Sequence, residues 1–211
     1  MSKKQTSEGE KITVHFDPQR CIHSGNCVRG LPGVFRAGVK GPWINPDEAE
    51  ADTLATLIET CPSGALTFDL KSGLAEKKPD LNTITVEANG PITVLADFTL
   101  NDEEPDSYRA TFCRCGASQN KPWCDGAHNQ IGFEDAGNVQ VFNPDAELPA
   151  GVLKIKTIKN GSLFLEGPHR ICNANGETAR TDDRCGICRC GASQNKPFCD
   201  GSHAAIGFQA D

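Results

Sequence analysis

Cysteine and histidine recur twice along the chain at one spacing. The segment from Cys113 to His128 reads C-x-C, eight residues, then C-x3-H, and the segment from Cys188 to His203 repeats it at an offset of 75 residues. The candidate ligands are two sets of three thiols and one imidazole: Cys113, Cys115, Cys124 and His128, then Cys188, Cys190, Cys199 and His203. Thiolate and imidazole bind zinc and iron. The repeat therefore predicts two metal centres.

The residues between the ligands suit this role. Two thiolates separated by one residue reach the same metal only from an extended or turning backbone, which Gly116 and Gly191 allow. Asp-Gly follows the third Cys of each set, where Asp can cap the start of a helix. A ligand three or four residues on then lies on the same face. A helix N-terminus aimed at an anionic cluster also stabilises its charge.

Both segments resemble the CDGSH iron-sulfur family, whose motif is C-x-C-x2-Ser/Thr-x3-Pro-x-C-Asp-Gly-Ser/Ala/Thr-His. The two copies match at every fixed position, including Ser118, Pro122, Ser193 and Pro197. The resemblance covers the chain after Leu81. It implies a 2Fe-2S cluster held by three Cys and one His in each motif. Members with a single motif pair as dimers, so it also implies that the two units pack as an intrachain pseudo-dimer.

Two other interpretations of the repeats remain open. Cys3His is also a common zinc set, although zinc sites usually space their first two cysteines as C-x2 to x4-C. A disulfide framework is the second alternative. Identical Cys/His loops in a chain that stays in a reducing compartment have no need of one.

Three further cysteines form a different kind of site. Cys21-Ile-His-Ser-Gly-Asn-Cys27, followed much later by Cys61-Pro62, resembles a one-cluster bacterial-type ferredoxin, with its C-x2-C-x2-C run and distant C-P. Ser24 stands at the second cysteine position. The resemblance covers about Ile12 to Leu70 and implies a 3Fe-4S cluster, or a 4Fe-4S cluster with a non-thiolate fourth ligand. His23 and Ser24 are the nearest candidates for that ligand. The alternative is three buried cysteines in a small α/β domain.

The elements that must position these ligands are short. Ile12–Phe16 alternates as a strand does, and Asn45-Pro46 predicts a helix start, with its buried face at Leu54, Leu57 and Ile58. That helix should stop at Cys61-Pro62. Residues 91–97 and 151–157 also alternate and predict a strand ahead of each Cys/His loop. A stretch that looks inserted, Glu166 to Cys185, precedes the second motif.

These elements indicate an α+β protein: a small ferredoxin-like N-terminal domain followed by two β-rich CDGSH-type units. We predict a ferredoxin-like domain at 11–70, a linker at 71–81 that is rich in charge with Gly73 and Pro79, and iron-sulfur units at 82–136 and 137–211.

Composition restricts the class of protein. Eleven cysteines in 211 residues demand either a disulfide framework or metal. Met1 to Lys11 is polar and no apolar run is long enough to cross a bilayer, so we expect a cytoplasmic protein with reduced thiols and no membrane contact. The net charge of −7 opposes nucleic-acid binding and suits a basic redox partner.

Several residues have plain interpretations. Cys172 and Cys185 fall outside the three sets. Cys185 either replaces a ligand, forms a redox-sensing disulfide when the cluster is lost, or is an ordinary thiol near the loop. His15 and His169 have no cysteine at metal spacing, which indicates surface or strand residues. Arg114 and Arg189 stand between two ligands, where they either offset cluster charge or are solvated.

Nothing in the sequence nominates a catalytic residue, so we expect a carrier and not an enzyme. The first hypothesis is a monomer that transfers electrons to or from a reductase or oxygenase. The second is a donor of clusters to an apo iron-sulfur acceptor, or a redox or pH sensor, because a protonatable imidazole makes its cluster labile. The third is a structural zinc protein.

Overall fold

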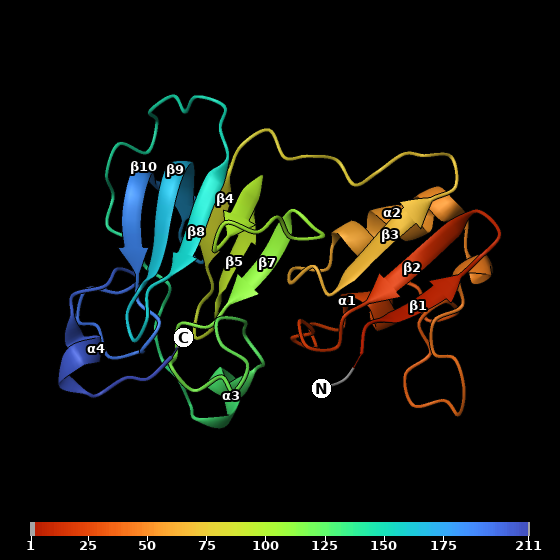
Figure 1. The fold of residues 1–211 in the computed structure, drawn as a ribbon, viewed down its shortest axis with the longest axis horizontal. Helices are drawn as coiled ribbons and strands as arrows, with labels where there is room; N and C mark the ends of the chain where they lie inside the picture. Colours follow the sequence, from red (N-terminus) through yellow and green to blue (C-terminus); the bar gives the residue numbers. More distant parts are fainter. Residues whose placement is uncertain (1–2, 211) are drawn as a thin grey trace. The chain divides into compact units, whose positions relative to one another are not determined.

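The computed structural model describes residues 3–210, so the ends of the predicted ranges at Met1, Ser2 and Asp211 lie outside the described residues. The chain divides into two compact units, Met1–Lys77 and Lys78–Asp211 (Figure 1). Among the described residues, no helix has the length and apolar character needed to span a bilayer.

The first unit is a three-stranded antiparallel sheet with helices against it. The strands lie in the order β1-β2-β3, with bounds Gln5–Glu8, Ile12–Phe16 and Leu66–Leu70. The helical elements are α1 (Asn26–Gly30), the 3-10 helix η1 (Pro46–Glu48) and α2 (Ala51–Glu59). Alternate residues of β2, including Ile12 and Val14, are buried under α2 residues Leu54 and Ile58 in one core. The predicted strand at Ile12–Phe16 is confirmed.

The prediction that a helix begins at Asn45 is wrong for the first turn. Pro46–Glu48 forms only a single 3-10 turn, Ala49 and Glu50 are extended, and α2 begins afresh at Ala51. The Asn45 side chain makes no capping hydrogen bond, so the turn that it would start is not stabilised as an α-helix. β1 also adds a strand ahead of the predicted boundary at residue 11.

The second unit contains both Cys/His repeats in one seven-stranded sheet. The strands are β4 (Thr83–Val86), β5 (Ile92–Leu95), β6 (Phe98–Leu100), β7 (Arg109–Phe112), β8 (Leu153–Thr157), β9 (Leu163–Cys172) and β10 (Thr178–Ile187). Their order is β6-β8-β9-β4-β5-β7, with β10 paired to β9. The stretch 166–185, which looks inserted in the sequence, falls within the long β9–β10 hairpin.

The two repeats place their ligand loops in the same way. β4, β5 and β7 pair antiparallel in succession in the first repeat, and β8, β9 and β10 do so in the second. Ile92 lies opposite Phe112, and Leu163 lies opposite Ile187. The residue after each of these partners is the first ligand, Cys113 or Cys188. Each ligand loop therefore leaves the sheet from a strand anchored in the core.

Each repeat also pairs with a strand of the other. β6 runs parallel to β8, with Phe98 opposite Leu153, and the second half of β9 runs parallel to β4, with Ile84 opposite Ile171. Residues of both repeats form a single buried cluster. The predicted segments 82–136 and 137–211 are thus parts of one compact unit, and α3 (Ala127–Gln130) and α4 (Ser202–Ala205) lie at the same end of its sheet (Figure 1).

His169 and Cys185 form a buried pair that sequence spacing did not indicate. His169 is fully buried on β9; its Nδ1 lies 2.8 Å from the Gly167 carbonyl oxygen and its Nε2 lies 3.4 Å from the Cys185 Sγ. The carbonyl must accept, so Nδ1 carries the proton and Nε2 accepts from the thiol. Burial raises the pKa of Cys185 to about 12 and lowers the pKa of His169. Both groups are therefore neutral at pH 7.

We predict that this pair makes stability depend on pH. The folded-state pKa of His169 lies below its unfolded value, because burial, aided by the charge of Arg180, outweighs the opposing effects of the Gly167 carbonyl, Asp182 and Asp183. The unfolded chain therefore takes up the proton first, and the free energy of unfolding falls as pH drops below about 6.5 toward the folded pKa. His169→Gln should weaken this acid dependence and cost about 1–3 kcal/mol at pH 8, because a buried hydrogen-bonding pair is broken.

Thermal unfolding followed by circular dichroism at pH 8 and pH 5.5 measures both effects. The control is His15→Gln on β2, where the imidazole is partly exposed and contacts Asp69 at 2.8 Å. Equal changes in the two variants would contradict a role for burial at His169.

Candidate metal centres

The ligands of the first repeat are presented as two pairs. Cys113 and Cys115 follow β7, and their Sγ atoms lie 3.7 Å apart. Cys124 precedes the short helix α3 and His128 lies on it; Cys124 Sγ is 3.5 Å from His128 Nδ1. Cys113 and Cys124 are buried, while Cys115 and His128 are half-buried.

These distances test which metal group the residues fit. Two thiolates at ~2.3 Å from one tetrahedral ion lie ~3.8 Å from each other, which agrees with the Cys113–Cys115 pair. A single zinc would require all four ligands to converge. Within residues 3–210, no three His, Cys, Asp or Glu side chains converge on a point that could hold one ion. Each pair, Cys113–Cys115 and Cys124–His128, has the spacing of two ligands of one metal atom, so the set fits a group with two metal atoms.

The second repeat copies the first pair of ligands. Cys188 Sγ and Cys190 Sγ lie 3.6 Å apart, again with the first buried and the second half-buried. Cys199 is half-buried, and His203 lies on α4 as His128 lies on α3. All eight residues predicted from the repeat are therefore on the two ligand loops at one end of the sheet (Figure 1).

The fixed residues of the motif hold the loop backbone. The Ser118 hydroxyl donates to the Trp123 carbonyl at 2.7 Å and accepts from the Asn120 N–H at 3.0 Å. The Asp125 carboxylate accepts from the N–H groups of Gln119 and Ala127 at 2.8 and 3.0 Å. Asp125 thus joins the start of α3 to the turn at Gln119. The predicted Asp cap is therefore present, but it comes from the residue before Gly126, which is the N-cap of the helix.

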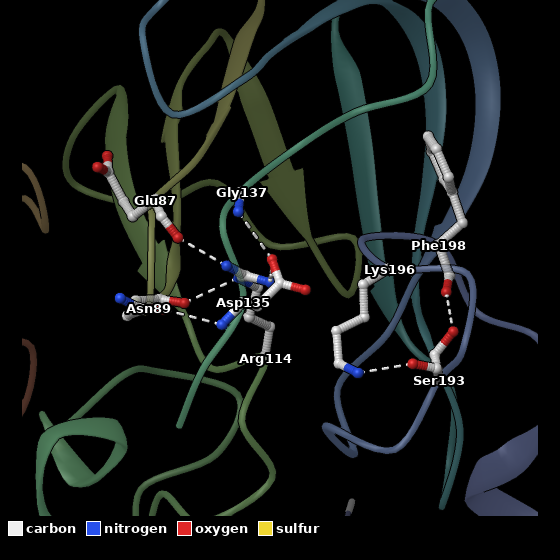
Figure 2. A network of polar contacts seen from close by, with 9 residues as sticks. Glu87, Asn89, Arg114, Asp135, Gly137, Ser193, Lys196 and Phe198 are labelled. Atoms are coloured by element: carbon white, nitrogen blue, oxygen red, sulfur yellow. Dashed lines mark hydrogen bonds and ion pairs between the residues drawn. The ribbon is translucent and has the colours of Figure 1, made fainter. Parts of the chain in front are cut away.

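The same contacts recur in the second loop. Ser193 donates to the Phe198 carbonyl at 2.7 Å, and the Lys196 Nζ donates to the Ser193 carbonyl at 2.6 Å (Figure 2). Asp200 accepts from the N–H groups of Gln194 and Ser202 at 2.8 and 3.0 Å. Because each ligand loop is tied by its own side chains, the ligand positions do not depend on the metal alone.

The thiols differ in how readily they become thiolates, which is the form that binds metal. The pKa of Cys113 is lowered to about 6, chiefly because the Cys115 thiol can donate to it, with help from nearby backbone N–H groups. The pKa of Cys115 is raised by the same shared proton. Burial raises the pKa of Cys124 to about 11. Metal binding at this loop must therefore release protons.

Arg114 is buried, and the expectation that it could be solvated is wrong. Its Nε donates to the Gly90 carbonyl at 2.8 Å, one terminal nitrogen donates to the Glu87 carbonyl at 2.6 Å, and the other lies 2.7 Å from the Asp135 carboxylate (Figure 2). The guanidinium group therefore ties the ligand segment to the β4–β5 turn. This buried ion pair lies at the residue between Cys113 and Cys115.

Arg189 does the same in the second repeat. It is 2% exposed, its Nε donates to the Gly161 carbonyl at 2.9 Å, and a terminal nitrogen donates to the Ile158 carbonyl. The acceptors are equivalent because Glu87 and Gly90 precede β5 as Ile158 and Gly161 precede β9. Sequence reasoning identified both arginines but could not place them, because their partners lie far away along the chain.

In the first unit, the three predicted cysteines line one cavity. Cys21, Cys27 and Cys61, together with His23 and Ser24, surround a space of about 390 Å³ whose other walls include apolar side chains. All three cysteines are half-buried, so they face this space at the edge of the core and are not packed inside it. Burial raises the pKa of Cys21, and the charges of Cys61 and Cys27 raise it further, which reflects their proximity.

Two groups in this cavity could complete a ligand set. His23 Nδ1 lies 4.0 Å from Cys21 Sγ, and His23 adopts a positive φ of 56°. Ser63, which sequence reasoning missed, is buried with its Oγ 3.7 Å from Cys61 Sγ. The three thiols and the cavity that they share fit a cluster held by three cysteines.

Arg29 and Asn26 hold the first cysteine loop in place. An Arg29 terminal nitrogen donates to the Ser24 carbonyl at 2.7 Å and to the Asn26 Oδ1 at 3.1 Å. The Asn26 amide in turn donates to the Thr60 carbonyl at 2.9 Å. Thr60 precedes Cys61, so this chain of hydrogen bonds fixes the distance between the early and the late cysteines.

Comparisons with known proteins agree with this arrangement. Residues 7–71 match the family described as divergent 4Fe-4S mono-cluster, and residues 89–129 and 160–204 match the iron-binding zinc finger of CDGSH type. Two curated relatives, each called uncharacterized protein YjdI, come from Escherichia coli strain K12 and Escherichia coli O157:H7. Each is 53% identical over 60 residues, which is 28% of this chain and 78% of the relative. No solved structure matches.

The matched ranges contain all eleven residues of the three predicted ligand sets. The chain therefore belongs to the divergent 4Fe-4S mono-cluster family through residues 7–71 and to the CDGSH-type iron-binding family through its two repeats.

Proposed function

We propose that this iron-sulfur protein is an electron carrier and not an enzyme. In this proposal each repeat holds a 2Fe-2S cluster and the first unit holds a 3Fe-4S or 4Fe-4S cluster. The division of four ligands into two pairs carries the proposal, since each pair suits one iron of a binuclear cluster. Such clusters accept and release single electrons, and their potentials follow from ligand type, hydrogen bonds and exposure.

The residues of the chain have separate roles in this proposal. Cys113, Cys115, Cys124 and His128 bind the metal of the first repeat, and their counterparts bind that of the second. Arg114 and Arg189 hold the loops and keep a positive charge beside the anionic sites. Trp123 stacks on Phe112 with ring centroids 5.1 Å apart and covers the loop from the sheet side. The half-buried histidines leave a path for electrons to a partner.

We also propose that the repeats act as an internal pseudo-dimer within a monomer. The reciprocal parallel pairs β6–β8 and β4–β9 support it, because each repeat gives the other an equivalent strand. The partner that we propose is a basic redox protein, either a reductase or an oxygenase. The net charge of −7 supports this choice through long-range attraction.

Donation of clusters is the second candidate function. His128 and His203 are only half-buried on four-residue helices, where water and an acceptor protein can reach the imidazoles. An imidazole ligand is protonatable and therefore easier to displace than a thiolate.

The metal content is the first prediction of this proposal. Protein purified without oxygen should be red-brown and contain iron and acid-labile sulfide. Cys113→Ala should lose the iron of the first repeat, because one ligand pair is broken. The control Cys172→Ala should keep all iron, because Cys172 contacts Thr178 and belongs to no ligand set. Iron, sulfide and zinc analysis measures this, and stoichiometric zinc in place of iron would reject the proposal.

The second prediction concerns the cluster of the first unit. Ser24→Cys adds a fourth thiolate to the cavity that already has three, so it should convert a 3Fe-4S cluster to 4Fe-4S or strengthen an existing 4Fe-4S cluster. EPR of the oxidised protein distinguishes them, because oxidised 3Fe-4S clusters are paramagnetic and oxidised 4Fe-4S clusters are not.

His23→Ala is the matched variant for the fourth ligand. If the unaltered protein holds an EPR-silent oxidised 4Fe-4S cluster, the appearance of a 3Fe-4S signal in His23→Ala, but not in Ser24→Ala, would identify His23. If Ser24→Cys leaves both the EPR signal and the iron content unchanged, the proposed position of the missing ligand is wrong.

The third prediction separates transfer of electrons from donation of clusters. Reduced protein mixed with oxidised cytochrome c, a basic one-electron acceptor, should reduce it quickly while retaining its own iron, and raising the salt concentration should slow the reaction because charge attraction is screened. Incubation with an apo-ferredoxin should move little iron. Rapid loss of iron to the apo-ferredoxin, without cytochrome reduction, would favour the donor function.

A further inference from the structure

The two ligand loops of the second unit touch at their ligands. Cys115 and Cys190, each the second thiol of its set, form an antiparallel bridge between the repeats. Residues directly opposite in such a pair have Cα atoms about 4.5–5.5 Å apart. The two proposed cluster sites are therefore in contact through the backbone of one ligand from each.

Glycine at one position of each repeat makes this contact possible. A Cβ atom at Gly116 would meet the Cys190 carbonyl oxygen at 2.5 Å, and a Cβ atom at Gly191 would meet the Cys115 carbonyl oxygen at 2.6 Å. Both glycines have positive φ, 82° and 80°. The near-equal distances show that the contact is reciprocal, with each ligand lying against the glycine that follows the other.

Side chains also cross between the loops. The Lys121 Nζ of the first loop lies 5.8 Å from the centre of the Phe208 ring, which follows the second. The loops are therefore close enough for a charge in one to be felt in the other.

We propose that the two repeat sites form one coupled redox pair across the Cys115–Cys190 contact. This rests on the proposed function, because both sites must hold redox-active iron. With iron held at both sites, one electron would pass from reduced iron in one repeat to oxidised iron in the other, with no bond formed or broken and no proton moved. The charge of the first electron also makes the second harder to add.

The expected size of this effect follows from the contact. Irons bound to Cys115 and Cys190 lie at most ~16 Å apart, given the bridge spacing and ordinary side-chain and metal–sulfur lengths. At an effective dielectric constant of about 20, the first electron at that distance lowers the equilibrium constant for adding the second electron about five- to tenfold. For a one-electron step this change lowers the reduction potential of the second site by about 40 to 60 mV.

A redox titration of the full chain, followed by the EPR signals of the reduced repeat sites, tests the proposal. Cys113→Ala and Cys188→Ala, each keeping one repeat site intact, supply the two intrinsic potentials. In the unaltered chain the second electron should enter at a potential more negative than the lower of the two intrinsic values by the amount above. A titration equal to the sum of the two single-site variants would overturn the coupling.

Two glycine variants separate the contact from backbone strain. Gly116→Ala adds a Cβ against Cys190, whereas Gly176→Ala, in the β9–β10 turn, has a similar φ of 80° but no atom within 4 Å of the added carbon. Gly116→Ala should reduce the coupling and Gly176→Ala should preserve it, both with iron retained. Equal coupling in both variants would overturn the role of the contact.

The outcomes also distinguish this proposal from the function on which it rests. If Gly116→Ala loses its iron, the EPR line width of the fully reduced unaltered chain is the deciding measurement. Magnetic broadening that is present in the unaltered chain but absent from both single-site variants supports the coupling. An unaltered chain without such broadening overturns it. A chain that binds iron and reduces cytochrome c but titrates as two independent sites would reject only the coupling. A chain without iron would reject both proposals.

Discussion

Each repeat of the second unit completes its sheet with a strand of the other, through the parallel pairs β6–β8 and β4–β9. Residues of both repeats bury their apolar side chains in one shared cluster. The shared sheet also sends both ligand loops to the same end of the unit, because equivalent strands lead into equivalent loops. The contact between the loops is therefore a consequence of how the core is built.

Within each loop, short-range hydrogen bonds do the positioning. Ser118 and Asp125 bind the backbone of their own loop and so fix the second and third ligands relative to one another. The long-range contribution comes from Arg114, whose guanidinium group joins the ligand segment to the β4–β5 turn and to Asp135. Removing water from a guanidinium group is costly, and the carbonyl and carboxylate partners offset that cost.

The first unit uses a different arrangement for its cysteines. Its ligands come from two places in the chain, and a helix-end contact, Asn26 to Thr60, brings those places together. The resulting cavity is mostly apolar, which lowers the local dielectric and raises the pKa of Cys21 and Cys27. The chain thus combines one open cavity with two tightly tied loops.

The sequence by itself indicated the families and predicted the candidate ligands of the repeats, because ligands within a loop of sixteen residues must follow a fixed spacing. It also predicted β2 and the buried face of α2, which depend on local alternation. Only the tertiary structure decided that β4 pairs with β9, that Arg114 is buried, and that His169 contacts Cys185. Each of these depends on segments far apart in the chain, and local spacing carries no record of which distant strand will supply the partner.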